Sequence, residues 1–189
     1  MKGKVFNAQE VQSILAGNKR MFREVIARNT RLGDSLFLNN YILEEAVESF
    51  CPYQVGQKIF YKESFSISQY FGDKSVRYWA SGESELEGWS KPKPAQHMKQ
   101  EHSRITLHIK DISVERLQSI SEEDCYKEGI RGFYNEDLSA GCGEAWESKT
   151  EDYLRKWLFK KPWNVTHKKP EEKFEANPWI WKIEVEVVK

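Results

Sequence analysis

The sequence has few cysteines and no cysteine or histidine spacing that marks a metal site. Its three cysteines, Cys51, Cys125 and Cys142, lie far apart, and no CxxC pair is present. His97 and His102 are five residues apart without a third ligand nearby. Disulfide frameworks and zinc sites need paired or closely spaced ligands. We therefore expect no disulfide framework, no metal and no cofactor.

The sequence also lacks net charge and long apolar runs. Its 29 basic and 29 acidic residues cancel, which excludes a general attractive field for nucleic acid and leaves only local patches. No apolar run approaches the roughly 20 residues that span a bilayer, and the N-terminus has no apolar signal core. Glycine-rich phosphate loops, GxSxG and HExxH are absent as well. We expect a soluble, cytoplasmic protein that does not insert into membranes.

The charges that are present are sorted along the chain. Residues 18–31 hold five basic residues against Glu24, whereas residues 121–152 hold ten acidic residues against three basic ones. Residues 155–173 return to seven basic residues against two acidic ones. Such blocks are usually solvated faces. For the last block a solvated loop is the favoured interpretation, and a track for a nucleic-acid backbone is the alternative.

Three short helices are predicted from apolar spacing and capping signals. The first covers residues 7–16, where Asn7 and Glu10 can form a capping box and Gly17 can take the left-handed end. The other two are residues 41–50 and a short segment that is capped by Ser121 and Asp124 and ended by Gly129.

Alternating apolar and polar residues predict half-buried strands at residues 58–62, 105–114 and 179–187. In the second strand the phase slips at Lys110 and Asp111, which predicts a bulge. Glu63 follows the first strand on the side of its apolar residues, so it reaches solvent at the strand tip or lies on the lip of a pocket. Trp179 and Trp181 share the apolar side of the last strand and are predicted to lie in the core.

The remaining segments are polar or broken by proline. Residues 66–100 are predicted to form a long loop or insertion with one hairpin near Val76–Trp79. Residues 144–159 have a helical pattern, and residues 160–178 form a basic, proline-broken connection. Strands separated by irregular stretches and short helices favour an α+β fold, a small barrel with helices at its edges, over a wound βαβ sheet.

Four stretches, taken in order, resemble the ASCH domain family (activating signal cointegrator homology) in its longer phage and prophage form. They are ILAGNKRMFR, CPYQVGQKIFYKES, HMKQEHSRITLHIKDISVERLQSISEEDCYKEGI and NPWIWKIEVEV, at residues 14–23, 51–64, 97–130 and 177–187. The resemblance implies a PUA-like fold, a small β-barrel of mixed or antiparallel sheet with flanking short helices. It implies one domain over residues 1–189, with long insertions at about 66–90 and 131–175, and RNA binding in a cleft beside the first helix.

The resemblance also implies a set of catalytic positions. Small bacterial relatives hydrolyse N4-acetylcytidine with a lysine after the first helix, a threonine three residues later and a glutamate at the end of the later short helix. In this sequence the lysine is Lys19 and the glutamate is Glu128, but the threonine position holds Phe22. Phenylalanine offers no oxygen for nucleophilic attack. The site therefore resembles a catalytic site that has lost its nucleophile and become more cationic.

Six residues are the candidates for contact with a nucleic-acid ligand. Cations after the first helix suit phosphate or the oxygen edge of a nucleotide, and carboxylates can accept from a base amino group. The alternative is that these cations pair with the acids of residues 121–152, and that the arginine at position 104 braces a carboxylate inside the fold. The candidates are Lys19, Arg20, Arg23, Glu63, Arg104 and Glu128.

Three hypotheses for function follow from these residues. The first is a phage-type ASCH module that binds RNA or a modified nucleotide. The second is an enzyme, either an amidohydrolase acting on acetylated cytidine through Lys19 and Glu128 or an ASCH-type ribonuclease. The third is an accessory protein with a decayed cleft that works through protein contacts. The sequence leaves the ligand and the oligomeric state open.

Overall fold

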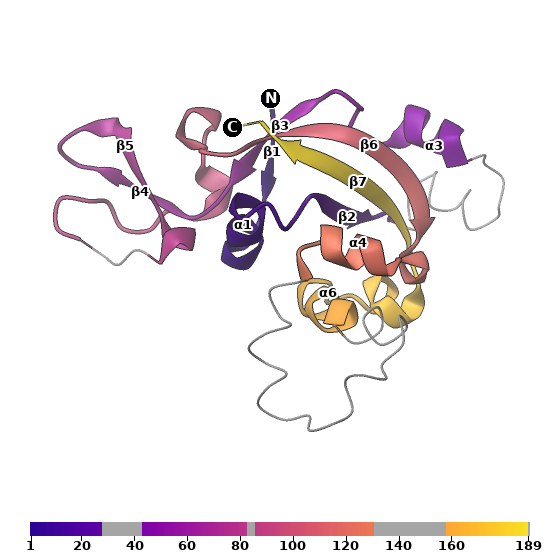
Figure 1. Ribbon diagram of the computed structural model, residues 1–189. Coiled ribbons are helices and arrows are strands. Elements are labelled where there is room, and N and C mark those ends of the chain that lie inside the picture. The colour runs from indigo at the N-terminus through magenta and orange to yellow at the C-terminus, as the bar shows by residue number, and fades with distance from the viewer. Residues whose placement is uncertain (28–42, 83–85, 131–157, 189) are drawn as a thin grey trace, which may run out of the picture.

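A computed structural model describes residues 1–27, 43–82, 86–130 and 158–188, and its main feature is a five-stranded sheet (Figure 1). The strand order is β1-β3-β6-β7-β2. β1 pairs in parallel with β3, and the other three pairings are antiparallel. The strands are β1 (Lys2–Val5), β2 (Met21–Val25), β3 (Lys58–Lys62), β6 (Thr106–Arg116) and β7 (Trp179–Val187). The α+β class is therefore confirmed.

The described helices are short and lie around the sheet. They are α1 (Ala8–Leu15), α3 (Leu43–Phe50), α4 (Glu122–Lys127) and α6 (Lys160–Thr166). α1 and α4 begin with the predicted capping boxes, in which each cap side chain accepts a backbone N–H and the third helical residue reaches back. Short 3-10 turns lie in the connections. They are η1 (Trp79–Ser81), η2 (Ala95–His97), η3 (Gln100–His102), η4 (Leu117–Ser119), η7 (Pro170–Glu172) and η8 (Phe174–Ala176).

The sheet is strongly curved but not closed by backbone pairing. β6 and β7 bend along their length (Figure 1), and their register shifts between Ile109 and Asp111, where the bulge was predicted. Within the described residues the pairing runs from β1 to β2, so these two strands form the edges. Lys4 of β1 nevertheless forms an ion pair with Glu24 of β2. A side-chain contact therefore links the two edges of the open sheet.

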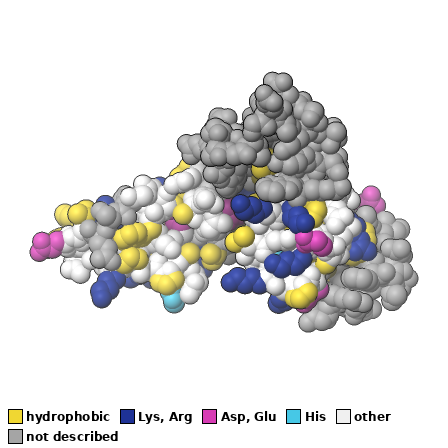
Figure 2. Space-filling model, turned by 90° about the horizontal axis from the view of Figure 1, so that it is seen from below, with side chains coloured by type: hydrophobic (Ala, Val, Ile, Leu, Met, Phe, Trp, Pro, Cys, Tyr) yellow, Lys and Arg dark blue, Asp and Glu magenta, His cyan; other side chains and the backbone are white. Residues whose placement is uncertain are grey.

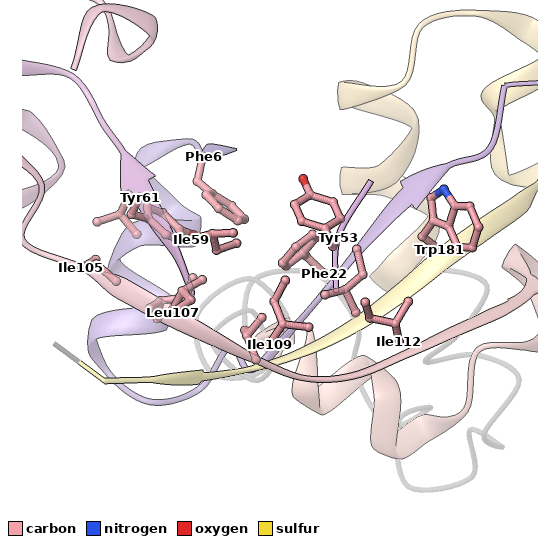
Figure 3. Packing of buried hydrophobic residues seen from close by; sticks show 14 of the residues in the cluster. Phe6, Phe22, Tyr53, Ile59, Tyr61, Ile105, Leu107, Ile109, Ile112 and Trp181 are labelled. Atoms are coloured by element: carbon pink, nitrogen blue, oxygen red, sulfur yellow. The ribbon is translucent and has the colours of Figure 1, made fainter. Parts of the chain in front are cut away.

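Two separate hydrophobic clusters lie on either side of β2. The larger one fills the concave side of the sheet, where Phe6, Phe22 and Tyr53 meet the aliphatic residues of β3 and β6 (Figure 3). The smaller one includes Phe159 and Trp163, packed with residues of η4, α4 and β7. Trp181 is buried in the larger cluster, as predicted for that strand. The division matters because a cavity lies between the two clusters.

Residues 66–100, predicted to be mostly loop, instead contain an ordered arm. β4 (Phe65–Ser68) and β5 (Gly72–Tyr78) pair as an antiparallel hairpin that projects from the body (Figure 1). The backbone of Ser90 donates to Ile67 at 2.9 Å, and the backbone of Lys93 donates to Phe65 at 2.7 Å. The hairpin predicted near Val76–Trp79 is therefore present and begins earlier, at Phe65, and its pairing satisfies backbone groups that a loop would expose to water.

Two other predictions concern residues 144–178, which the structure describes from residue 158 onward. The helix predicted at residues 144–159 lies outside the described residues except at its end. The connection predicted at residues 160–178 contains α6, which was missed because Pro162 stands in its first turn, where proline is tolerated. Across the described ranges, no helix combines the length and apolarity needed to cross a membrane.

Candidate functional site

A cavity of about 530 Å³ opens beside α1, between the end of β1, β2, the end of α4 and α6. Its lining comes from four segments that are distant in sequence, within residues 4–13, 19–25, 128–130 and 159–172. This volume falls in the range of about 300–1,000 Å³ that is typical of small-molecule sites. Lys19, Arg23 and Glu128 are among the lining residues. Three of the six sequence candidates therefore meet at one concavity.

Lys19 and Glu128 are brought together by backbone as well as side chains. The two residues form an isolated antiparallel bridge, and the neighbouring Arg20 donates its N–H to Lys127 at 2.7 Å. Lys19 Nζ lies 2.6 Å from Glu128 Oε2 and 3.6 Å from Glu10 Oε1. The Lys19 side chain is only 6% exposed. Its ammonium group is thus held between two carboxylates at the cavity.

Arg23 lies beneath this pair and is shared by three carboxylates. Its guanidinium donates to Glu128 Oε1 at 2.9 Å, Asp124 Oδ2 at 2.9 Å and Glu115 Oε1 at 3.0 Å, and its side chain is 0% exposed. Burial alone would lower the pKa of Arg23, but the charges of these three carboxylates outweigh it and raise the pKa above its ordinary value. Arg23 therefore orients Glu128 and is not free to hold a phosphate.

The turn after α4 sets the distance between Glu128 and α1. Gly129 has φ +85°, and a Cβ at this position would come within 2.2 Å of Ser13 Oγ and 3.1 Å of Lys19 Cβ. Only glycine allows this left-handed backbone to approach so closely without strain. Ser13 lines the cavity, and its hydroxyl contacts no hydrogen-bond partner among the described residues.

Aromatic rings from two separate hydrophobic clusters line the cavity. Phe6 and Phe22 contribute from the larger cluster, with ring centroids 5.8 Å apart in a T-shaped arrangement. Phe159 and Trp163 contribute from the smaller cluster, with ring centroids 5.5 Å apart. His167 stacks on Trp163 at 3.8 Å. Phe22, at the position of the family threonine, therefore lines the cavity as part of an apolar wall.

The rim near the sheet edges is also charged. Lys4 pairs with Glu24, and its Nζ lies 4.4 Å from the centre of the Phe22 ring. The Tyr53 hydroxyl donates to Glu24 Oε1 at 2.7 Å. Burial and the nearby Glu24 charge raise the pKa of Tyr53, so this hydroxyl stays protonated and remains a donor. The rim therefore consists of a paired lysine and carboxylate supported by a phenol.

Glu63 and Arg104 do not line the cavity. They form their own ion pair, in which Arg104 Nε and Nη2 each donate to a Glu63 oxygen at 2.8 Å. The Arg104 guanidinium also lies 4.3 Å from the centre of the Tyr78 ring. The arginine thus braces a buried carboxylate, as the alternative interpretation stated, and the prediction that it points into the cleft was wrong.

Arg20 and the basic block before β7 lie on the surface. Arg20 is exposed and is not part of the cavity lining. Figure 2 shows basic side chains, with acidic ones among them, gathered over the end of the molecule that carries α6. In this region Lys160 lies 2.7 Å from Glu175, and Lys169 lies 2.9 Å from Glu172. These pairs agree with a solvated face.

The sequence candidates did not include the aromatic walls or the lining residues Lys4 and Glu10. Phe6 precedes a helix cap, and Trp163 lies in a basic connection, so neither has a periodic neighbour that marks a site. Among the described residues, no group of three or more histidine, cysteine, aspartate or glutamate side chains is placed to hold a metal ion.

Comparisons with known proteins give distant similarity of shape to solved structures. No protein-family model and no curated protein matches the chain. A crystal structure from Enterococcus faecalis V583, of a protein described by the family model DUF984, aligns with a TM-score of 0.36 and 12% identity. The alignment covers 92% of this chain but 63% of that protein, so the chain spans less than two thirds of its length. A similarity at this level assigns neither family nor function.

Proposed function

We propose that this protein is a nucleic-acid-binding module that holds RNA or a modified nucleotide in the cavity beside α1. The observation that carries the proposal is the meeting of Lys19, Arg23 and Glu128 at one cavity between aromatic walls. Sequence-tolerant stacking of a base on aromatic rings contributes about 1–3 kcal/mol per base. A carboxylate can in addition accept from a base amino group.

The proposal assigns different roles to the converging side chains. Lys19 and Glu128 line the cavity and would contact the ligand directly, because both offer polar atoms at its surface. Arg23 is a positioning residue, since its fully covered guanidinium holds Glu128 Oε1 and leaves Oε2 to Lys19. Glu63 and Arg104 have a structural role, because their charges are satisfied by each other.

The finer fold assignment, a PUA-like small barrel of ASCH type, is part of the same proposal. Two observations support it. The curved sheet has its edge strands linked by the Lys4–Glu24 pair, and the cavity opens beside the first helix, where the family resemblance implies a cleft. The single-domain organisation and the phage origin are inferred from that resemblance alone.

Binding can be tested with short fluorescently labelled single-stranded RNA and with free nucleosides. We expect binding by the wild-type protein, and an affinity at least tenfold lower for Lys19→Ala and for Glu128→Gln. Lys99→Ala is the control, because Lys99 precedes η3 and its side chain is 68% exposed. Far-UV circular dichroism verifies that each variant is folded. The absence of binding by a folded wild-type protein would exclude the proposal.

A second candidate is the hydrolysis of N4-acetylcytidine, favoured by the 2.6 Å contact between Lys19 and Glu128 inside the cavity. Phe22 argues against it, because the ring offers no nucleophile where the relatives have threonine. Incubation with N4-acetylcytidine, followed by chromatography for cytidine, separates the two candidates. Turnover that is lost in Lys19→Ala and Glu128→Ala would replace the binding-only proposal with the enzymatic one.

A further inference from the structure

We infer that the cavity takes the base of its ligand and rejects phosphate, and that it prefers a planar heteroaromatic base carrying a positive charge, such as a ring-N-methylated nucleobase. This inference rests on the proposed function and specifies the ligand class of the same cavity. It follows from the pairing of the cations, the placement of the carboxylates and the aromatic walls.

Each lysine and arginine that lines the cavity is already paired with a carboxylate. Lys4 pairs with Glu24, and Lys19 pairs with Glu128. Arg23 contacts three carboxylates and has no exposed side-chain surface. A phosphate entering the cavity would have to compete with these carboxylates for every cation. The like charges of the phosphate and the carboxylates would also repel one another at short range.

The carboxylates that line the cavity differ in how closely they contact a cation. Glu10 lines the cavity and its side chain is 33% exposed; Lys19 Nζ lies 3.6 Å from its Oε1, and its Oε2 accepts from the backbone N–H of Asn7 at 3.0 Å. Lys19 is in closer contact with Glu128, at 2.6 Å. Glu172 also lines the cavity and pairs with Lys169, whose side chain is 68% exposed. The cavity therefore has carboxylate charge available for a cationic or donor-bearing guest.

The walls suit a flat cation. Rings from two different clusters line the cavity, Phe6 and Phe22 from the larger one and Phe159 and Trp163 from the smaller one. The faces of aromatic rings attract cations, and the attraction is stronger when the cation is desolvated. Here Lys4 already lies over the Phe22 ring at 4.4 Å. A ring-methylated purine combines a flat shape with a positive charge at mildly acidic pH.

Isothermal titration calorimetry at mildly acidic pH, where both methylated nucleosides are cations, tests the inference with three sets of compounds. These are 1-methyladenosine and 7-methylguanosine, then adenosine and guanosine, and then the 5′-monophosphates of all four. We expect the methylated nucleosides to bind at least tenfold more tightly than their unmodified counterparts, and each monophosphate to bind more weakly than its nucleoside. A short oligoribonucleotide carrying the same methylated base shows whether the ligand is free or part of RNA.

Glu10→Gln is the diagnostic variant, because glutamine can keep the capping box of α1 while the charge is removed. We expect it to reduce the preference for methylated nucleosides several-fold, whereas Lys99→Gln leaves it unchanged. Equal binding of methylated and unmodified nucleosides, or tighter binding of monophosphates, would overturn the inference and leave the proposed function standing. If no nucleoside, nucleotide or oligonucleotide binds, both fail.

Discussion

The guanidinium of Arg23 is fully covered by protein and shared by Glu115, Asp124 and Glu128. A buried ion network contributes less net stability than its short distances suggest, because each charge has lost its hydration. Removal of one partner is nevertheless costly, since the remaining charges stay buried without compensation. Arg23 is thus important to the fold whether or not the cavity binds a ligand.

Replacement of Arg23 by methionine tests this role. Methionine can fill most of the volume but leaves three carboxylates without their shared donor, so we expect a loss of about 3–5 kcal/mol in the free energy of unfolding. Urea denaturation followed by circular dichroism measures the loss. The exposed neighbour provides the control, since Arg20→Met should change stability by less than about 0.5 kcal/mol. Equal effects at both positions would contradict a role for the buried network.

Asp124 links the same network to pH. Burial favours the neutral acid, but the hydrogen bond from Lys182 and the charge of Arg23 outweigh this and lower the pKa of Asp124. A lowered folded-state pKa stabilises the fold above the unfolded value of about 3.9, and the contribution is lost as the pH falls. We expect Asp124→Asn to be less stable than wild type at pH 7, with the difference shrinking below about pH 4.

Urea midpoints between pH 7 and pH 2.5 measure this difference. Lys182→Met serves as the matched variant, because Lys182 Nζ lies 3.0 Å from Asp124 Oδ2 and its removal should weaken the acid dependence. A difference between wild type and Asp124→Asn that stays constant over the whole range would show that Asp124 does not couple to folding.

At the scale of single elements, the turn at Gly129 determines whether α4 can deliver Glu128 to the cavity. Gly129 and Gly56 have nearly the same backbone angle, with φ +85° and +84°. A Cβ at Gly56 would meet nothing within 4 Å, whereas one at Gly129 would meet Ser13 and Lys19. The two positions therefore separate the cost of the left-handed backbone from the cost of crowding.

We expect Gly56→Ala to lower the free energy of unfolding by about 1–2 kcal/mol, the cost of a left-handed backbone for a non-glycine residue. Gly129→Ala should lower it by more and should also weaken ligand binding, because α1 and Lys19 must move away from Glu128. Thermal unfolding and the nucleoside titration measure the two effects. Equal losses of stability for both variants would mean that the α4 turn tolerates displacement from α1.

An element could be predicted from the sequence when the residues that determine it lie close together in the chain. Asn7 with Glu10, and Ser121 with Asp124, determine their helix starts within four residues, so both capping boxes were predicted correctly. The bulge near Lys110 was predicted because the alternation of apolar and polar residues slips there. The β4–β5 hairpin was predicted near Val76–Trp79, but its first strand, β4, was missed, since its polar sequence resembles a loop until the pairing strand is known.

At the scale of the whole molecule, the cavity depends on segments that no local pattern connects. Lys19 and Glu128 were predicted to lie together, but from family resemblance and not from spacing. Trp163 gave no signal, because its position against the cavity depends on the packing of α6. Glu63 was predicted to join the cavity, yet its nearest strong partner is Arg104. A carboxylate at a strand end has several possible partners, and only tertiary packing selects one.

The Lys4–Glu24 pair joins the two edge strands of the open, curved sheet. It joins the edge strands β1 and β2, its side chains are 18% and 29% exposed, and Glu24 also accepts from Tyr53. An exposed pair within the sheet, Lys110 with Glu186, has side chains 54% and 58% exposed. Both pairs join a lysine to a glutamate. The Lys4–Glu24 pair is less exposed and links the two edge strands, whereas the Lys110–Glu186 pair does not.

Double-mutant cycles with Lys4→Met and Glu24→Gln, and with Lys110→Met and Glu186→Gln, measure the two coupling energies by urea denaturation. We expect about 1 kcal/mol or more for the edge pair and close to zero for the exposed pair, because solvent screens the second. Coupling energies of equal size would show that the edge contact does not hold the sheet curved.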